Sequence, residues 1–341
     1  EPLTTYLGVD AGEFDKRLKN AKSKGFVYLR RHLPPAEVRE ILELKIPGIY
    51  SKREYKRFYP AGEVAAHVVG FTDVNDKGQE GLELSFNKWL AGTSGERRVL
   101  KNLHHEIIRD IKPVSEAQPG RNLTLGIDLR LQYLAYRELK SAVTSFQAES
   151  GSVIVLDVES GQVLAMVNQP SYNPNNRVGL ELSAVRNRAL TDAYEPGSTV
   201  KPFIVGFALQ SGKYSPQSTI DTAPGFVRVG NFTIRDPLNR GEITLGEVIM
   251  YSSQVGISKL ALNLNEYEIR GMFEKLGFGR DTGTGFPGES AGRLPNHRRW
   301  TDIERAALAY GYGLTVTPMQ LAASYLTIAS GGIKRDVSLI A

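Results

Sequence analysis

A serine and a lysine three positions apart, Ser198 and Lys201, have the types and spacing for covalent chemistry in this 341-residue sequence. A serine hydroxyl becomes a nucleophile when a base accepts its proton. A lysine can be that base if burial lowers its pKa. Residues three apart share a helix face, so we expect the Lys201 amine to reach the Ser198 hydroxyl. The alternative is a helix cap followed by a solvated lysine.

The residues around this pair predict a turn followed by an apolar helix. Glu195-Pro196-Gly197 is a tight-turn sequence, and residues 199–212 continue as a strongly apolar helical run. Ser198 is therefore expected at a helix N-terminus, where backbone N–H groups and the positive end of the helix dipole can stabilise an oxyanion. A second Ser-x-x-Lys, residues 85–88, lies in an amphipathic segment and is interpreted as structural. On these residues alone, both interpretations of Ser198 stay open.

The composition limits the classes of function. The chain has a formal net charge of +5 and no cysteine. Without cysteine, disulfides, zinc-thiolate sites and thiol catalysis are excluded. The basic residues are scattered along the chain, so we predict no nucleic-acid partner. The sequence contains no run of about 18 apolar residues, so no segment is expected to span a membrane.

The expected elements of the first third are mixed. Helices are predicted at 10–25 and 33–46, and strand-like runs occur at 26–31, 97–102 and 107–114. A turn sequence at 115–122 contains Pro119-Gly120 and marks the expected boundary between two domains. The predicted domains are therefore residues 1–118 and 119–341.

The second part has clearer periodicity. Asp128 is the expected N-cap of a helix over 129–146, and two apolar runs at 152–158 and 163–168 predict a β-hairpin. Further helices are predicted at 245–263, 268–276 and 318–330. Because a helix, a hairpin and more helices follow each other with little βα alternation, the pattern favours an α+β fold over a doubly wound sheet.

Three other features could suggest a ligand, and each has a simpler interpretation. His104 and His105 are adjacent on an expected strand, so their side chains point to opposite faces, and no carboxylate cluster accompanies them. His67 lies in an apolar stretch and is interpreted as a structural histidine. The glycines of 277–289 do not follow a strand and open a helix, as a phosphate-binding loop must. We therefore predict no metal and no cofactor.

Several longer motifs surround these residues. They are YNPNN (172–176), EPGSTVKPF (195–203), SSQVGISKLAL (252–262), DTGTGFPGE (281–289), AYGYGLTVTPMQLA (309–322) and the long run from RFYPAGEV to NKWLAG (57–92). Together they closely resemble the class B penicillin-binding proteins, the D,D-transpeptidases that cross-link bacterial peptidoglycan. The likeness covers nearly the whole chain and is nearest to the division-specific, septal branch of that class.

The resemblance implies a role for five residues. Ser198 would be the acylated nucleophile, Lys201 its proton acceptor, and Ser252 a relay of a proton toward the departing D-alanine. Gly197 and Gln254 would contact the substrate. The family has Asn where this chain has Gln254, and its Lys-Thr-Gly motif occurs nowhere in the sequence. The transpeptidase domain is therefore expected to be incomplete at its C-terminus, and the first domain to be a non-catalytic pedestal.

The resemblance also implies partners and a location. The substrates would be peptidoglycan stem peptides and their lipid-linked precursor, and β-lactam antibiotics would acylate the same serine. A membrane glycosyltransferase and other division proteins would be partners. The location would be the bacterial inner membrane, with the catalytic domain in the periplasm and the anchor outside this sequence. The alternatives are a non-catalytic division-machinery module with a degenerate site, a β-lactam sensor, and a D,D-carboxypeptidase or β-lactamase of the same fold.

Overall fold

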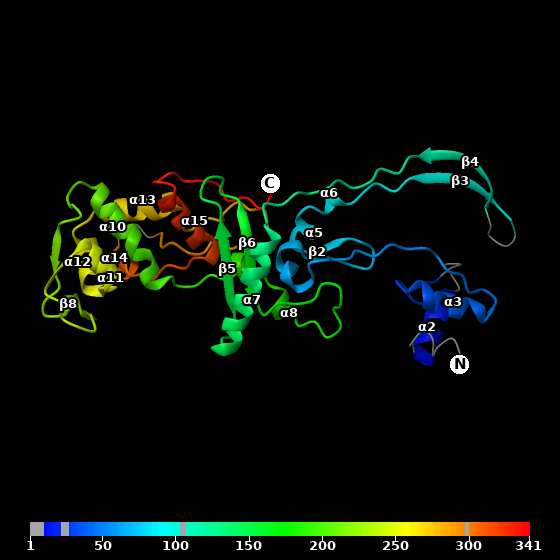
Figure 1. Cartoon of the computed structure of the whole chain (residues 1–341), viewed down its shortest axis with the longest axis horizontal. Helices are drawn as coiled ribbons and strands as arrows, with labels where there is room; N and C mark the ends of the chain where they lie inside the picture. Colours follow the sequence, from blue (N-terminus) through cyan, green and yellow to red (C-terminus); the bar gives the residue numbers. More distant parts are fainter. Residues whose placement is uncertain (1–9, 22–26, 103–106, 297–299) are drawn as a thin grey trace. The chain divides into compact units, whose positions relative to one another are not determined.

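The computed structural model describes residues 10–21, 27–102, 107–296 and 300–341. The chain folds as two compact units, one of residues 1–60 and 72–77 and the other of residues 61–71 and 78–341. Figure 1 shows the elements along the chain. The expected boundary after residue 118 stays a prediction of where the catalytic domain begins.

The described part of the first unit contains two helices, both at positions predicted from the sequence. They are α2 (Ala11–Ala21) and α3 (Pro35–Glu43), and α3 begins at the expected prolines. The strand expected at 26–31 is wrong for residues 27–31, which are irregular. Leu29 packs against the buried Ile41, and the Arg31 guanidinium is bound by Glu54 at 2.9 Å. These side-chain contacts hold the segment in place, whereas a strand would be held by backbone hydrogen bonds to a neighbouring strand.

The second unit begins with short elements and a hairpin. In chain order they are η1 (Gly62–Val64), α4 (Ala66–Val69), β1 (Phe71–Thr72, whose second residue belongs to the first unit), β2 (Gly78–Glu80), α5 (Gly81–Ser85), α6 (Asn87–Leu90), β3 (Glu96–Lys101) and β4 (Ile107–Ser115). Strands β3 and β4 pair antiparallel with irregular register. The two strand-like runs predicted there are confirmed.

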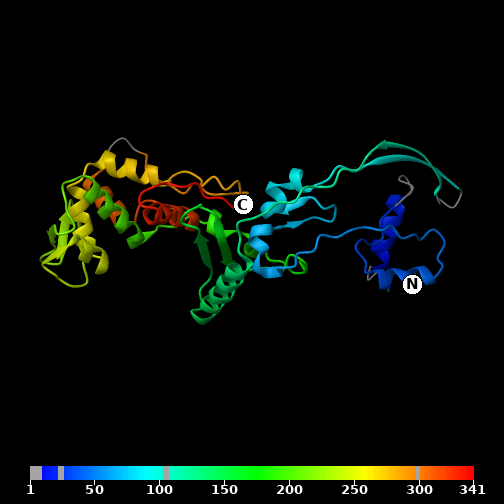
Figure 2. The same cartoon turned by 45° about the horizontal axis from the view of Figure 1, so that its top comes forward.

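A helix and a hairpin form the next layer of the second unit. Helix α7 (Leu129–Ser145) begins after Asp128, whose carboxylate accepts from the Arg130 N–H at 2.9 Å, so the predicted cap is confirmed. Strands β5 (Gly151–Leu156) and β6 (Val163–Gln169) pair antiparallel as expected. In both views α7 lies along this hairpin (Figure 1, Figure 2). The buried Gln132 amide fixes the helix on β6 through both backbone groups of Met166.

Most of the remaining elements surround one large apolar core. In chain order, the remaining elements are α8 (Leu182–Val185), α9 (Arg188–Thr191), η2 (Gly197–Val200), α10 (Lys201–Gln210), β7 (Thr219–Asp221), β8 (Phe226–Val229), β9 (Phe232–Arg235), β10 (Glu242–Thr244), α11 (Leu245–Met250), α12 (Gln254–Leu262), α13 (Glu266–Leu276), α14 (Asp302–Ala309) and α15 (Pro318–Ala329). Helices α10 and α12 supply much of this core, with Phe203 and Ile204 against Ile257 and Leu260. The predicted helices at 268–276 and 318–330 are confirmed.

Two antiparallel strand pairs in this region were not predicted. Strand β7 pairs with β10, and β8 pairs with β9. The residues between Val229 and Phe232 are Gly230 and Asn231, a pair typical of two-residue hairpin turns. That signal, flanked by alternating apolar residues, could have identified the second pair.

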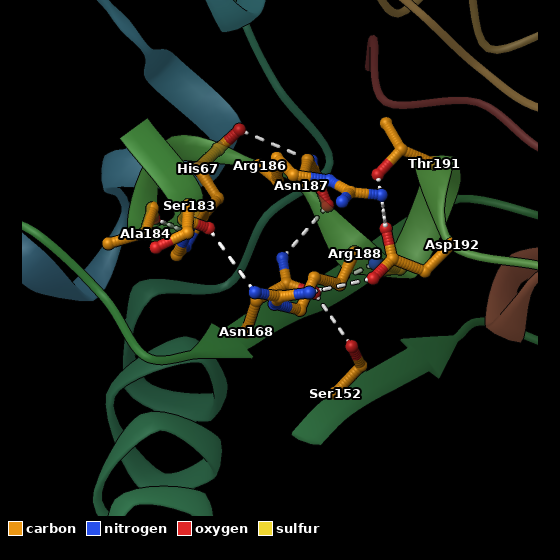
Figure 3. Close-up of polar contacts among 11 residues, drawn as sticks. His67, Ser152, Asn168, Ser183, Ala184, Arg186, Asn187, Arg188, Thr191 and Asp192 are labelled. Carbon is orange, nitrogen blue, oxygen red and sulfur yellow. Dashed lines mark hydrogen bonds and ion pairs between the residues drawn. The ribbon is translucent and has the colours of Figure 1, made fainter. Parts of the chain in front are cut away.

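A buried polar network ties three segments of the second unit together (Figure 3). The Asn168 side-chain amide of β6 donates to Asn187 Oδ1 at 2.8 Å, and Asn168 Oδ1 accepts from the Ser152 hydroxyl at 2.7 Å. The Asn187 amide donates in turn to the His67 carbonyl at 3.2 Å. Because both asparagines are buried, these bonds satisfy groups that would otherwise be costly to bury.

His67 is a buried titratable residue of this region. Its Nε2–H donates to the Ala184 carbonyl at 2.8 Å, and its ring packs edge-on against Tyr172 at 5.4 Å between centroids. The predicted structural role is therefore confirmed. Burial lowers the pKa of the imidazole to about 4, because the charged form loses its hydration.

This burial predicts an acid-dependent loss of stability. The unfolded chain protonates His67 below about pH 6.5, whereas the native imidazole stays neutral until about pH 4. Stability is therefore complete above pH 6.5 and falls as the pH drops toward 4, by roughly 3 kcal/mol for this group. Urea unfolding at pH 7 and pH 5 should show a larger loss for the native sequence than for His67→Gln, whose amide can still donate to Ala184. Equal losses would contradict the assignment.

Candidate active site

Ser198 lies in a tight turn that other parts of the second unit hold in place. It is exposed and belongs to η2, directly before α10. Gly197, at a φ of +58°, donates its N–H to the Gly311 carbonyl at 3.1 Å. The Tyr325 hydroxyl donates to the Thr199 carbonyl at 2.8 Å. The turn is thus fixed on both sides of the serine.

Lys201 is the first residue of α10 and is 1% exposed. Its Nζ donates to the Ser252 carbonyl at 2.5 Å and to the Ser252 hydroxyl at 3.0 Å. The Ser252 hydroxyl donates to the Ser198 hydroxyl at 2.9 Å. The expected proximity of lysine and serine is therefore realised through an intervening hydroxyl: Lys201, Ser252 and Ser198 form one continuous chain of hydrogen bonds.

Burial changes the chemistry of the lysine. The pKa of Lys201 is lowered to about 8, mainly by desolvation, while the Asp236 carboxylate acts in the opposite direction. At pH 7 about a tenth of such an amine is neutral. A neutral amine has a lone pair, so the hydroxyl protons of Ser252 and Ser198 can then point toward it. The chain can carry a proton from Ser198 to Lys201.

The helix expected over 245–263 is broken, and this part of the prediction is wrong. Helix α11 ends at Met250, α12 begins at Gln254, and Ser252 between them has a φ of +53°. The apolar spacing continues through both helices, so periodicity could not locate the break. The left-handed residue turns the Ser252 side chain out of the helical path, and such strained positions cluster at functional sites.

Gln254 contributes its backbone to this turn. Its N–H donates to Asp236 Oδ1 at 2.6 Å, and the neighbouring Ser253 hydroxyl donates to Asp236 Oδ2 at 2.5 Å. The Gln254 side chain is half-buried at the start of α12. Asp236 was not predicted. It lies 18 residues before Gln254 in the sequence and comes close only because β8 and β9 fold back.

The other candidates lie outside this arrangement. The Ser85 hydroxyl donates to the Gly285 carbonyl at 2.9 Å, which supports its structural interpretation. His104 and His105 lie outside the described residues. Across the described ranges, no group of three or more His, Cys, Asp or Glu side chains could hold a metal ion. In the same part of the chain, no helix combines the length and apolar character needed to cross a bilayer.

Two domain families match the sequence. The penicillin binding protein transpeptidase domain matches residues 151–341, and the penicillin-binding protein dimerisation domain matches residues 1–125. Peptidoglycan D,D-transpeptidase FtsI of Escherichia coli K12 is 46% identical over 338 residues, covering 99% of this chain and 57% of that protein. The probable peptidoglycan D,D-transpeptidase PbpC of Pseudomonas aeruginosa is 41% identical over 324 residues, covering 95% and 57%. The chain spans less than two thirds of the length of these relatives.

Solved structures are similar as well. Penicillin binding protein 3 of Mycobacterium tuberculosis, complexed with aztreonam, has a TM-score of 0.73 and 31% identity, over 83% of this chain and 60% of that one. The transpeptidase domain of Burkholderia pseudomallei penicillin-binding protein 3 has a TM-score of 0.59 and 38% identity, over 65% and 63%. These similarities confirm the α+β fold expected from the sequence.

Proposed function

This chain belongs to the class B penicillin-binding proteins, and from that premise we propose that it is a serine-type peptidoglycan D,D-transpeptidase that cross-links stem peptides during septal cell-wall synthesis. The observation that carries the proposal is the hydrogen-bond chain from the buried Lys201 amine through Ser252 to the exposed Ser198 hydroxyl. It joins a base of lowered pKa to a hydroxyl that a substrate can reach.

The first half-reaction acylates Ser198. Its oxygen attacks the carbonyl carbon of the penultimate D-alanine of a stem peptide, and its proton passes through Ser252 to the neutral Lys201 amine. The new carbon–oxygen bond gives a tetrahedral intermediate. When the carbon–nitrogen bond breaks, the proton returns along Ser252 to the departing nitrogen, so D-alanine leaves as an amine and the stem stays on Ser198 as an ester.

The second half-reaction transfers the acyl group. An amine from a neighbouring stem attacks the ester carbon, its proton moves to Lys201, and Ser198 recovers its hydrogen as the ester bond breaks. The product is an amide that joins the two stems. A β-lactam would follow only the first half, because its leaving nitrogen stays tethered in the opened ring and the acyl-enzyme persists.

The other residues and segments take supporting roles in this proposal. Gly197 and Gln254 would contact the substrate peptide. Residues 1–118 would form the non-catalytic pedestal and residues 119–341 the transpeptidase domain. The protein would act in the periplasm at the inner membrane, on lipid-linked precursor, together with a membrane glycosyltransferase and other division proteins.

Intact-protein mass spectrometry after incubation with a penicillin tests the proposal. We expect a stable adduct in the full-length protein, mapped to Ser198 and absent from Ser198→Ala, because alanine has no oxygen to acylate. The same protein given a stem-peptide donor and an amine acceptor should form the cross-linked product rather than only the hydrolysed stem.

Each outcome separates the alternatives. An unmodified mass in the folded full-length protein would contradict the enzyme and favour a non-catalytic binding module. An adduct without any acyl transfer would favour a β-lactam sensor. Release of D-alanine to water alone would favour a carboxypeptidase.

A further inference from the structure

Asp236 lies outside the Ser198–Lys201 and Ser252–Gln254 motifs, and its carboxylate binds the turn that follows Ser252. Resting on the proposed function, we propose that Asp236 is a positioning residue for acylation: its carboxylate clamps the turn that carries Ser252 and places a negative charge beside the Lys201 amine. It would act through these two residues without touching the substrate.

The carboxylate of Asp236 caps the N-terminus of α12. Oδ1 accepts from the N–H groups of Gln254 at 2.6 Å and Val255 at 3.2 Å, and Oδ2 accepts from the Ser253 hydroxyl at 2.5 Å. The Ser253 oxygen in turn accepts from the Gly256 N–H at 2.8 Å. A charged acceptor at this end of a helix satisfies donors that have no intrahelical partner and interacts favourably with the helix dipole.

This cap fixes the conformation of Ser252. The left-handed conformation of a serine is unfavourable and persists only where the surroundings determine it. On one side, the backbone N–H groups of Ser252 and Ser253 donate to Ile249 and Val248 of α11 at 3.0 and 2.9 Å. Ser252 itself accepts from Lys201 through its carbonyl and its hydroxyl, and the residues that follow it are held by Asp236. Without the Asp236 carboxylate, the turn would keep its contacts to α11 and to Lys201 but lose those that fix the start of α12.

The backbone of Asp236 is itself anchored, since its N–H donates to the Gly225 carbonyl at 2.9 Å at the base of the β8–β9 hairpin. It is the charged group that raises the pKa of Lys201 against the effect of desolvation. Five other titratable groups on or near the elements packed against α10 have partners of their own: Glu195 with the Gly313 N–H, Glu247 with Thr244, Lys259 with the Asp221 carbonyl, Arg270 with Glu274, and Tyr325 with the Thr199 carbonyl. The titratable side chains of Tyr251, Glu266, Tyr267, Glu268 and Lys275 lie on or beside the same helices, and the pKa of Lys201 is raised by Asp236 alone among the charged groups.

The substitution Asp236→Asn separates the two roles. The asparagine oxygen can still accept from the backbone N–H groups, and its amide can donate to the Ser253 oxygen, so the turn should be kept while the charge is lost. The rate of acylation by a penicillin should rise with pH and level off near the pKa of Lys201, about 8 in the native sequence. Because a lost negative charge disfavours the ammonium form, we expect the midpoint in Asp236→Asn to move to lower pH, by roughly half a unit or more.

The substitution Asp236→Ala removes both the charge and the clamp. We expect the plateau rate of acylation to fall by about 10²-fold, because a small displacement of a reacting group has that effect, and the midpoint to move to lower pH as in Asp236→Asn. Glu242→Gln is the matched control: it removes one exposed negative charge from neighbouring β10 and should leave both the midpoint and the rate unchanged. Circular dichroism and thermal melting of each variant report whether it is folded.

The outcomes are distinguishable from failure of the proposed function, which would show as no adduct in the native sequence. If the native protein acylates and Asp236→Asn keeps its midpoint, the charge role is overturned. If folded Asp236→Ala acylates at the native rate, the clamp role is overturned. Should either variant not fold, Ser253→Ala tests the clamp: it keeps the carboxylate, so the rate should fall with the midpoint unchanged, and a native rate would overturn the proposal.

Discussion

Replacing Lys201 with methionine should abolish measurable acylation and, at the same time, raise the melting temperature. In the proposed mechanism, the loss follows from removal of the proton acceptor at the end of the hydrogen-bond chain to Ser198, and a general base typically contributes about 10²–10⁴ in rate. The gain in stability follows because Lys201 is 1% exposed and its charged form is poorly hydrated there. Methionine has a similar length and no charge to bury.

Two measurements check this prediction: the second-order rate constant for acylation by a penicillin, and the melting temperature by calorimetry. Lys259→Met is the matched control, since Lys259 is a lysine of α12 whose amine binds the Asp221 carbonyl at 2.6 Å and takes no part in the chain to Ser198. It should acylate within a few-fold of the native rate. A Lys201→Met variant that acylates normally would remove the lysine from the mechanism.

A loss of acylation together with a rise in melting temperature would show that Lys201 serves activity at the expense of stability. Burying an amine lowers the free energy of unfolding, which is small in any protein, so a lysine whose removal raises stability and abolishes acylation would be retained for chemistry. A merely structural lysine would show both properties falling together. The sequence alone allows either a helix cap with a solvated lysine or a catalytic pair at Ser198 and Lys201. The two measurements together distinguish these interpretations.

The sequence predicted the elements with strong local signals. Asp128 marked the start of α7, the two apolar runs marked the β5–β6 hairpin, and the turn before Ser198 preceded an apolar helix. Each of these depends on neighbours within one or two turns of the chain, where capping and periodicity act.

The geometry between elements was not predictable in the same way. The spacing of Ser198 and Lys201 indicated a shared face, but the hydroxyl that joins them, Ser252, comes from 54 residues away. Apolar spacing continues across the break at Ser252, so the sequence does not reveal it, and Asp236 is brought to this turn by the β8–β9 strand pair. Contacts between residues far apart in the sequence do not change the local periodicity, so a sequence pattern cannot predict them. In this protein such contacts are concentrated at the candidate active site.

Substitution of a glycine in the 310–313 turn is the second change for which we expect a large loss of stability and of acylation. Gly311 and Gly313 both have left-handed backbones, with φ of +86° and +79°. A Cβ added at Gly311 would lie 2.0 Å from the Gly197 carbonyl oxygen, whereas one added at Gly313 would meet nothing within 4 Å. A side chain at either position would therefore have the cost of a left-handed conformation. Only at Gly311 would it also clash with a neighbouring backbone.

Gly311→Ala should lower the free energy of unfolding by about 3 kcal/mol or more, because the clash adds to the cost of a left-handed alanine. It should also slow acylation by about 10²-fold, since relief of the clash moves the Gly197–Ser198 turn away from Ser252. Gly313→Ala should lose only about 1–2 kcal/mol and keep its acylation rate within a few-fold. Urea unfolding and penicillin acylation of both variants provide the comparison.

The contrast between the two variants is what tests the role of the Gly311 contact. If both alanines lower stability and acylation equally, backbone conformation alone explains the loss and the Gly197 contact is not a positioning contact. If only Gly311→Ala loses acylation, Ser198 depends on the close approach of two backbones, Gly311 and Gly197, that only a residue without a side chain allows. The nucleophile would then be positioned from three directions: the Gly311 turn, α15 through Tyr325, and the hydroxyl of Ser252.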